Sequence, residues 1–215
     1  MSKMICVMGE SGSGKTTAMR TLDPKSTFYI DCDSKGLAWK GWREQYSVEN
    51  KNFCSDRSLP KINALLKNID QNAPHIKTIV IDTLNTCMVD KEIKEMGNKD
   101  GFSKWIDLAQ YVWSICETAA TLRDDLTIII VMHSETVRDD LGYSFTRIKT
   151  NGRKLEKVVL ETLFGVVLLA KCKDDGTYIF ETKGKQSTTK TPLGAFEKDE
   201  IPNDMQAVLN ALADF

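Results

Sequence analysis

Long apolar runs are missing from this sequence, since no stretch approaches the ~18 residues that a membrane-spanning helix needs. The longest ones, around Ile128–Met132 and Val166–Ala170, have the length of strands. No basic and apolar leader precedes the first strand-like segment, so nothing indicates secretion. We therefore expect a cytoplasmic protein that has no membrane partner.

The sequence also lacks an excess of one charge and any paired cysteines. It has 29 Lys+Arg against 30 Asp+Glu, a net charge of -1, so a nucleic-acid surface would have to be a local patch. The 6 cysteines form no CxxC or CxxH pair, and several lie in apolar runs. We interpret them as reduced core thiols rather than as zinc ligands or disulfides.

Strand-like and helix-like segments alternate along the 215 residues, which suits one α/β domain that spans 1–215. The first four strands are almost continuously apolar, as expected for a parallel sheet that is covered on both faces. The predicted strands are Met4–Met8, Thr27–Asp31, Thr78–Asp82, Thr127–Met132, Val166–Ala170 and Tyr178–Thr182. The predicted helices are Lys15–Leu22, Leu59–Ile69, Asn85–Met96, Phe102–Leu122, about 153–163, and one that starts near Asn203.

Two segments break this alternation. Residues 134–152 are polar and without periodicity, and we expect a functional, mobile loop there. Residues 173–176, with the sequence Lys-Asp-Asp-Gly, predict the turn of a hairpin near the C-terminus. The predicted fold is a mainly parallel sheet with antiparallel C-terminal edge strands.

A phosphate-binding loop lies between the first strand and the first helix. Residues 9–16 fit the pattern G-x-x-x-x-G-K-[ST], in which glycines let backbone N–H groups crowd around a phosphate. The helix N-terminus favours negative charge, and Lys15 can reach the β- and γ-phosphate oxygens. Thr16 can ligate Mg²⁺, and Thr17 can bond the α-phosphate. The predicted nucleotide-binding residues are Gly9, Glu10, Ser11, Gly12, Ser13, Gly14, Lys15, Thr16 and Thr17.

The strand Thr78–Asp82 ends in the carboxylate that such a loop requires. Asp82 would hold Mg²⁺ through water, together with Thr16. A guanine-specific N-K-x-D is absent, because the segment 98–101 has Gly where the base-reading Asp belongs. We therefore expect ATP and Mg²⁺ as the bound groups.

The segment Tyr29–Asp33 resembles the second strand of RecA-type recombinase cores, which ends in the general base for water. This resemblance gives Asp33 that role, although the family normally uses Glu, and Asp31 is the alternative. The segment Thr127–His133 is similar to the RecA strand that ends in a polar γ-phosphate sensor. His133 would be that sensor.

In RecA the DNA-binding loop follows that strand, and residues 134–152 stand in its place. From Arg147 to Lys157 there are five basic residues and a single acid, Glu156. Tyr143 and Phe145 lie just ahead and would stack on bases. The resemblance implies that single-stranded DNA is bound by Arg147, Lys149, Arg153 and Lys154.

Lys183 and Lys185 match two RecA lysines that reach across a subunit interface to the ATP of the neighbour. The resemblance therefore implies self-association in a ring or filament. In their order, the matches cover most of residues 4–200. The chain looks most like the minimal RecA-like ATPases encoded by phages, grouped with single-strand annealing recombinases, which would place it in the host cytoplasm.

The leading hypothesis is a DNA-dependent ATPase that assists annealing or homologous recombination, with a single-strand DNA-binding protein as a further candidate partner. A nucleotide kinase is the alternative, in which Arg138 or Arg147 would form a lid over the transferred phosphoryl group. A third hypothesis is an ATPase that loads a protein partner.

Overall fold

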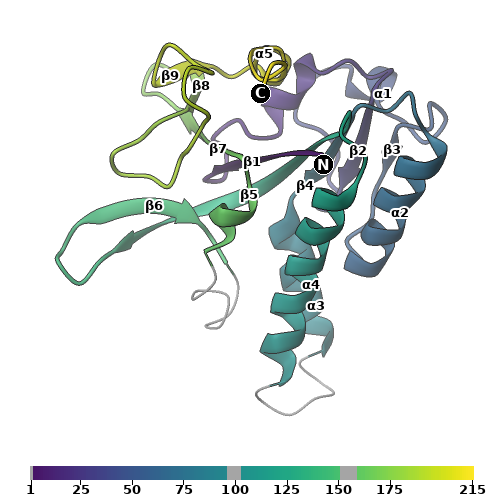
Figure 1. The fold of residues 1–215 in the computed structure, drawn as a ribbon, viewed down its shortest axis with the longest axis horizontal. Coiled ribbons are helices and arrows are strands. Elements are labelled where there is room, and N and C mark those ends of the chain that lie inside the picture. The colour runs from purple at the N-terminus through teal and green to yellow at the C-terminus, as the bar shows by residue number, and fades with distance from the viewer. Residues whose placement is uncertain (1, 96–102, 151–158) are drawn as a thin grey trace.

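The structure is a computed structural model that describes residues 2–95, 103–150 and 159–215. One sheet runs through its centre (Figure 1). The strands are β1 Lys3–Gly9, β2 Thr27–Asp31, β3 Phe53–Cys54, β4 Thr78–Asp82, β5 Thr127–Arg138, β6 Ser144–Ile148, β7 Val166–Cys172, β8 Tyr178–Glu181 and β9 Glu200–Pro202. The helices are η1 Thr17–Thr21, α1 Trp42–Gln45, α2 Leu59–Asn72, α3 Leu84–Glu95, α4 Ser103–Thr121, η3 Leu160–Leu163 and α5 Met205–Ala211.

The strand order is β3-β2-β4-β5-β1-β7-β8-β9, and β6 pairs with β5 off this path. Strands β3 to β7 along this order pair in parallel, whereas β8 and β9 pair antiparallel at the C-terminal edge. The predicted fold class is therefore confirmed. All five residues of β4 are buried, which explains why its sequence reads as a continuous apolar run.

Helices cover both faces of the sheet (Figure 1), and a hydrophobic core lies on each face. The core on one face joins the sheet to α2, α3 and α4, through residues such as Leu66, Met88 and Ile115. The opposite core joins the sheet to η1 and α5, through Met19 and Val208. Among the described helices, none combines the length and the apolar character that a membrane crossing requires.

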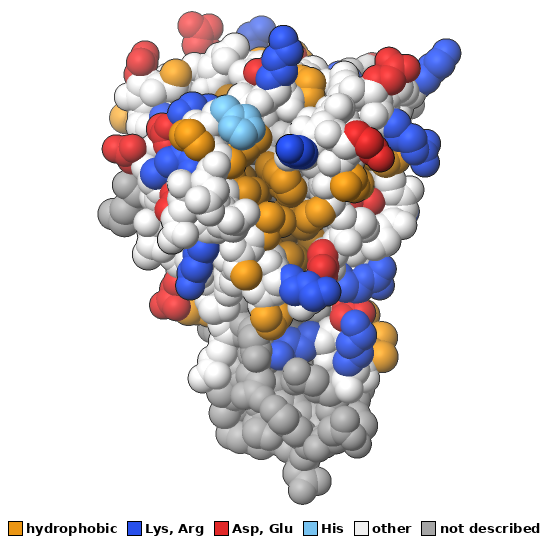
Figure 2. Space-filling view, turned by 90° about the vertical axis from the view of Figure 1, so that its right-hand side faces the viewer, with side chains coloured by type: hydrophobic (Ala, Val, Ile, Leu, Met, Phe, Trp, Pro, Cys, Tyr) orange, Lys and Arg blue, Asp and Glu red, His pale blue; other side chains and the backbone are white. Residues whose placement is uncertain are grey.

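The face on the β3 side carries hydrophobic side chains gathered at its centre (Figure 2). Around them, Lys and Arg side chains are interspersed with Asp and Glu. The side chains drawn in colour on this face form no continuous basic surface, as expected from the net charge of -1.

The expected irregular loop at 134–152 is instead a β-hairpin over its described residues. β5 continues to Arg138, and β6 returns antiparallel from Ser144 to Ile148. In the turn, Asp139 Oδ1 accepts hydrogen bonds from the backbone N–H groups of Leu141 and Tyr143, at 3.0 and 2.8 Å. The prediction was wrong because the strand residues there are largely polar, so the segment has no apolar run. We call residues 134–148 the arm.

Several element boundaries also differ from the prediction. The helix after the phosphate loop is the short 3-10 helix η1 rather than an α-helix over Lys15–Leu22, so a helix dipole contributes little there. The short strands β3 and β9 were not predicted, because two or three residues carry no periodicity. Of the helix predicted at about 153–163, residues 153–158 lie outside the described residues, and 160–163 form η3.

The C-terminal predictions are confirmed. The turn at 173–176 closes with a 2.8 Å hydrogen bond from Gly176 N–H to the carbonyl of Lys173, and Gly176 has a φ of 82°. Helix α5 begins after Asp204, whose Oδ1 accepts the N–H of Ala207 at 3.0 Å.

Candidate nucleotide-binding site

The candidate site lies at the carboxyl ends of the parallel strands β1, β2 and β4, where β5 runs between β1 and β4. Gly9, the last residue of β1, is level with His133 of β5. Asp31, the last residue of β2, is level with Asp82, the last residue of β4. The carboxyl ends of parallel strands form the usual ligand-binding edge of such sheets. The structure thus brings together most of the predicted catalytic residues.

The phosphate loop follows β1 and contains Gly12 and Gly14, whose φ angles are 80° and 90°. A Cβ at Gly14 would also lie 2.6 Å from the Tyr178 ring, so both conformation and space require glycine there. The hydroxyls of Ser13 and Ser134 are buried without a hydrogen-bond partner among the described residues. Both residues line a pocket of about 300 Å³ beside the loop.

Lys15 is almost fully buried within this loop. Its Nζ donates hydrogen bonds to the carbonyls of Gly9 and Glu10, at 2.8 and 2.6 Å. Burial lowers the pKa of Lys15 to about 8, against the opposing attraction of Asp82. Neutral carbonyls only partly compensate a buried ammonium, so phosphate oxygens would be stronger partners for it.

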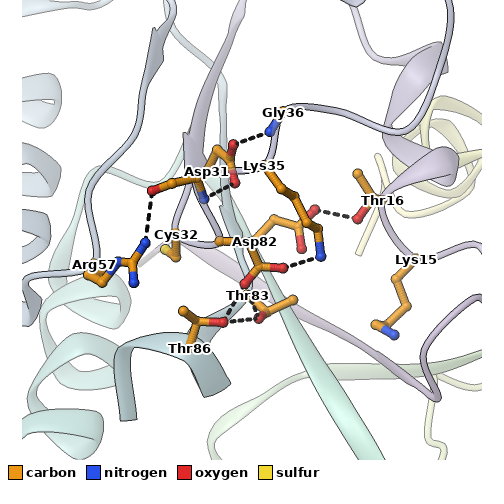
Figure 3. A network of polar contacts seen from close by, with 12 residues as sticks. Lys15, Thr16, Asp31, Cys32, Lys35, Gly36, Arg57, Asp82, Thr83 and Thr86 are labelled. Atoms are coloured by element: carbon orange, nitrogen blue, oxygen red, sulfur yellow. Dashed lines mark hydrogen bonds and ion pairs between the residues drawn. The ribbon is translucent and has the colours of Figure 1, made fainter. Parts of the chain in front are cut away.

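Asp82 and Thr16 meet as the sequence predicts (Figure 3). Thr16 Oγ1 donates a 2.7 Å hydrogen bond to Asp82 Oδ2, and the Tyr29 hydroxyl donates to the same oxygen at 2.6 Å. The other oxygen, Oδ1, is buried and has no partner among the described residues. Burial raises the pKa of Asp82, and the two donors only partly oppose that shift.

These residues fit Mg²⁺, because an unpartnered carboxylate oxygen beside a threonine hydroxyl is a hard, anionic ligand. The described residues hold no cluster of three His, Cys, Asp or Glu that would bind a metal alone. A magnesium ion at Asp82 would therefore need phosphate oxygens and water as its remaining ligands, as is usual in nucleotide sites.

The two candidate bases, Asp31 and Asp33, have different surroundings, and Figure 3 labels Asp31 together with Lys35, Thr83 and Thr86. Both carboxylate oxygens of Asp31 accept backbone N–H groups of the following turn, from Ser34 at 3.0 Å and Gly36 at 2.9 Å. Asp33 Oδ1 accepts hydrogen bonds from the hydroxyls of Thr83, at 3.1 Å, and Thr86, and its Oδ2 pairs with Lys35. Partial burial raises the pKa of Asp33, but its bonds to Lys35, Thr86 and Thr83 outweigh this and lower it overall.

His133 lies half-buried at the root of the arm. Burial lowers the pKa of its imidazole, and the charge of Lys15 adds to this shift, so both favour the neutral ring. Its backbone is held by Asn85, a buried residue that sequence reasoning missed. Asn85 Oδ1 accepts the N–H of His133 at 2.7 Å, and its Nδ2 donates to the carbonyl of Lys149 at 2.9 Å.

Asn85 therefore bridges the outgoing strand of the arm to the chain just after its return strand. Asn85, His133 and Lys149 also line a pocket of about 220 Å³. The sequence shows only that Asn85 is a polar residue near the start of α3, three positions after Asp82. Its hydrogen-bond partners lie 48 and 64 residues away along the chain. No local pattern points to such a role.

The predicted DNA-binding residues are only partly described. Arg147 is level with Glu135 on the facing strand, and its Nε pairs with Glu135 Oε1 at 2.9 Å. Lys149 is exposed, whereas Arg153 and Lys154 lie outside the described residues. Of the two aromatic residues, Tyr143 lies in the turn of the hairpin and is 70% exposed, whereas Phe145 on β6 is half-buried. The basic run is therefore partly neutralised within the arm.

Lys183 and Lys185 are exposed in the loop after β8, and β7 separates β8 from β1. The strand that precedes these lysines is therefore not a neighbour of β1, which leads into the phosphate loop. Their loop instead pairs with the arm, because Thr146 N–H donates to the Gln186 carbonyl and Thr188 N–H donates to the Thr146 carbonyl, both at 2.8 Å.

A phosphate loop, a strand-end aspartate bonded to its threonine, and a mainly parallel sheet define a P-loop nucleotide-binding ATPase. Comparison with known families agrees. A family model described as an AAA domain matches residues 1–197, and the chain belongs to this family.

The fold is similar to the crystal structure of a KaiC-like protein from the hyperthermophilic archaeon Pyrococcus horikoshii OT3. The TM-score is 0.51 at 9% sequence identity, covering 88% of this chain and 82% of that one. At this identity the likeness concerns the fold alone. A search of curated proteins finds no significant match.

Proposed function

We propose that this protein hydrolyses ATP with Mg²⁺ and couples hydrolysis to single-stranded DNA in annealing or homologous recombination. The observation that carries the ATPase part is Asp82, which shares one oxygen between Thr16 and Tyr29 and keeps the other unpartnered. Bound Mg²⁺ would neutralise phosphate charge as the γ-phosphoryl group is transferred to water. Lys15 would exchange its carbonyl partners for β- and γ-phosphate oxygens.

Asp33 is the better candidate for the base that accepts the proton of the attacking water. Asp31 uses both of its oxygens on the backbone of its own turn. The partner of Asp33, Lys35, has a side chain that is 65% exposed, so water screens this pair and can replace it. Thr83 and Thr86 would then keep the carboxylate oriented while water takes the place of Lys35.

The arm is the proposed site for DNA. It extends away from the body of the molecule (Figure 1), and its root holds His133 at the nucleotide edge. Its acidic residues Glu135, Asp139 and Asp140 outnumber its basic residues Arg138 and Arg147, and Lys149 follows β6 directly. Binding would combine stacking on Tyr143 with phosphate contacts from Lys149 and from the basic residues that follow it, and its affinity would fall as salt rises.

We further propose that the protein acts as an assembly, in a ring or filament. Lys183 and Lys185 are exposed and have no hydrogen bond or ion pair within the described part of the chain that would occupy them. Their loop is hydrogen-bonded to the arm, so DNA on the arm would influence how the lysines meet the ATP of a neighbouring subunit.

The kinase alternative gains no support from the arginines that it needs. Arg138 Nε donates to the Gly142 carbonyl at 2.9 Å, and Arg147 pairs with Glu135. Both arginines are thus engaged within the arm rather than directed over the phosphate loop.

The test is ATP turnover with and without single-stranded DNA, with nucleoside monophosphates as the competing stimulus, each in Mg²⁺ and in EDTA. We expect Mg²⁺-dependent hydrolysis that DNA accelerates and monophosphates do not. Stimulation by a monophosphate, with ADP formed from it, would support the kinase instead. If neither addition changed the rate of hydrolysis, the ATPase part of the proposal would stand and the coupling to single-stranded DNA would be contradicted.

A further inference from the structure

Tyr29 is the second donor to Asp82, and sequence reasoning gave it no role in the site. It lies on β2, the strand next to β4, and its side chain is completely buried. Its hydroxyl reaches Asp82 Oδ2 at 2.6 Å, the same oxygen that Thr16 contacts at 2.7 Å. Packing alone does not account for this hydroxyl, because phenylalanine would fill nearly the same space.

Two donors on one oxygen fix the rotation of a carboxylate. Because both Tyr29 and Thr16 bond Oδ2, the plane of the Asp82 carboxylate is set and Oδ1 is left unpartnered. Thr16 alone would leave the group free to rotate about a single bond. Partners behind a metal-ligating group commonly orient it in this way.

The Tyr29 ring is itself held rigidly by an aromatic cluster. Its centroid lies 5.4 Å from Tyr46, 6.4 Å from Phe53 and 6.5 Å from Trp39. The edge-on arrangement with Tyr46, at an interplanar angle of 61°, is a favoured geometry for aromatic pairs. A buried ring with such neighbours keeps one rotamer, so its hydroxyl stays at one place.

We propose that Tyr29 is a positioning residue of the Mg²⁺ site, which orients Asp82 by a hydrogen bond and ties that carboxylate to the aromatic cluster. The inference rests on the proposed Mg²⁺-nucleotide function and deepens it. Tyr29 would act through Asp82, which is the residue that its hydroxyl contacts.

The test compares Tyr29→Phe with the wild type by calorimetric titration of ADP, in Mg²⁺ and in EDTA. The quantity measured is the ratio of the two affinities, which isolates the contribution of the metal. We expect this ratio to fall by about tenfold, the low end for loss of a partner behind a metal ligand. Affinity in EDTA should stay unchanged, because the phosphate loop is intact.

Tyr46→Phe is the matched control, since it removes a hydroxyl from an equally buried ring of the same cluster. The Tyr46 hydroxyl is not bonded to Asp82 in the described structure. We expect Tyr46→Phe to keep the wild-type ratio. Circular dichroism and melting curves establish that both variants fold.

A folded Tyr29→Phe variant with the wild-type ratio would overturn the inference while leaving the proposed function intact. An equal loss in Tyr46→Phe would also overturn it, because the effect would then belong to the cluster in general. If the wild type itself bound ADP equally well with and without Mg²⁺, the proposed function would fail together with the inference.

Discussion

The nucleotide edge and the arm both include the strand β5, yet they differ in how deeply their polar groups are buried. At the edge, β5 is buried between β1 and β4, and polar groups such as Asp82 and Lys15 are almost fully enclosed. Beyond His133, the strand leaves the body and its alternate residues face solvent. Buried polar groups need partners or ligands, whereas exposed ones are satisfied by water.

This difference in burial decides how strongly a basic side chain indicates a ligand. The enclosed Lys15 has only neutral carbonyls as hydrogen-bond partners, which points to a ligand. Arg147, which lies half-buried on the hairpin, has a carboxylate partner on the facing strand, Glu135, which accounts for it without any ligand. A basic residue in a buried loop is therefore stronger evidence of binding than a basic run on a hairpin.

The largest expected effect is at the buried edge. Lys15→Ala removes the cation that we propose for the β- and γ-phosphates, and we expect turnover to fall by more than about 10³-fold. Lys25→Ala is the control, because Lys25 is exposed and lies just before β2, whereas the site lies at the other end of that strand, so this variant should turn over normally. Steady-state ATP hydrolysis measures both. Near-normal turnover in Lys15→Ala would remove the ATPase assignment.

The next effect concerns the exposed lysines. The double variant Lys183→Ala/Lys185→Ala should lose about 10³-fold in turnover if the pair acts like an arginine finger. Mixing it with Lys15→Ala should restore part of the activity, because some interfaces then join an intact loop to intact lysines. A mixture that stays inactive, although each variant still assembles, would contradict action across subunits.

A smaller effect separates Asp33 from Asp31. Asp33→Asn should slow hydrolysis by about 10²-fold while ADP binding persists, since only the group that accepts the proton is lost. Asp31→Asn should weaken the turn at Ser34 and Gly36 and lower the melting temperature, with hydrolysis largely kept. Single-turnover hydrolysis and ADP titration measure both variants, and the reverse pattern would make Asp31 the base.

On the arm we expect changes in DNA binding rather than in hydrolysis without DNA. Lys149→Ala should flatten the slope of log affinity against log salt by about 0.7, the value for one phosphate contact. Glu135→Gln should strengthen binding, because it frees Arg147 from its partner. Fluorescence anisotropy with a labelled oligonucleotide across salt concentrations measures both. If Lys149→Ala kept the wild-type slope and Glu135→Gln kept the wild-type affinity, the arm would not be the DNA-binding site.

The smallest effect is the pH dependence of stability that His133 brings. Its pKa is lowered by burial, so the unfolded chain binds the proton more readily below pH ~6.5. Stability is thus lost as the pH falls from there toward the lowered pKa. His133→Gln should reduce the drop in melting temperature between pH 7.5 and 5.5, whereas exposed His75→Gln should not. Equal drops in both variants would show that other groups dominate.

The sequence by itself determined the features whose causes lie close together along the chain. β2 and β4 match their predicted bounds, because burial on both faces produces unbroken apolar runs. The phosphate loop and the strand-end Asp82 were predicted for a similar reason. A loop must supply its glycines and its lysine within eight residues, so the pattern is contiguous.

Only the tertiary structure decided the contacts between strands. The hydrogen bond from Tyr29 to Asp82 joins residues 53 positions apart, and it exists because β2 and β4 are neighbours in one register. Asn85 and the pair Arg147–Glu135 depend in the same way on β5 turning back into a hairpin. Register fixes which side chains face each other across strands, and a shift of one residue would reverse every such contact. No local pattern carries that information.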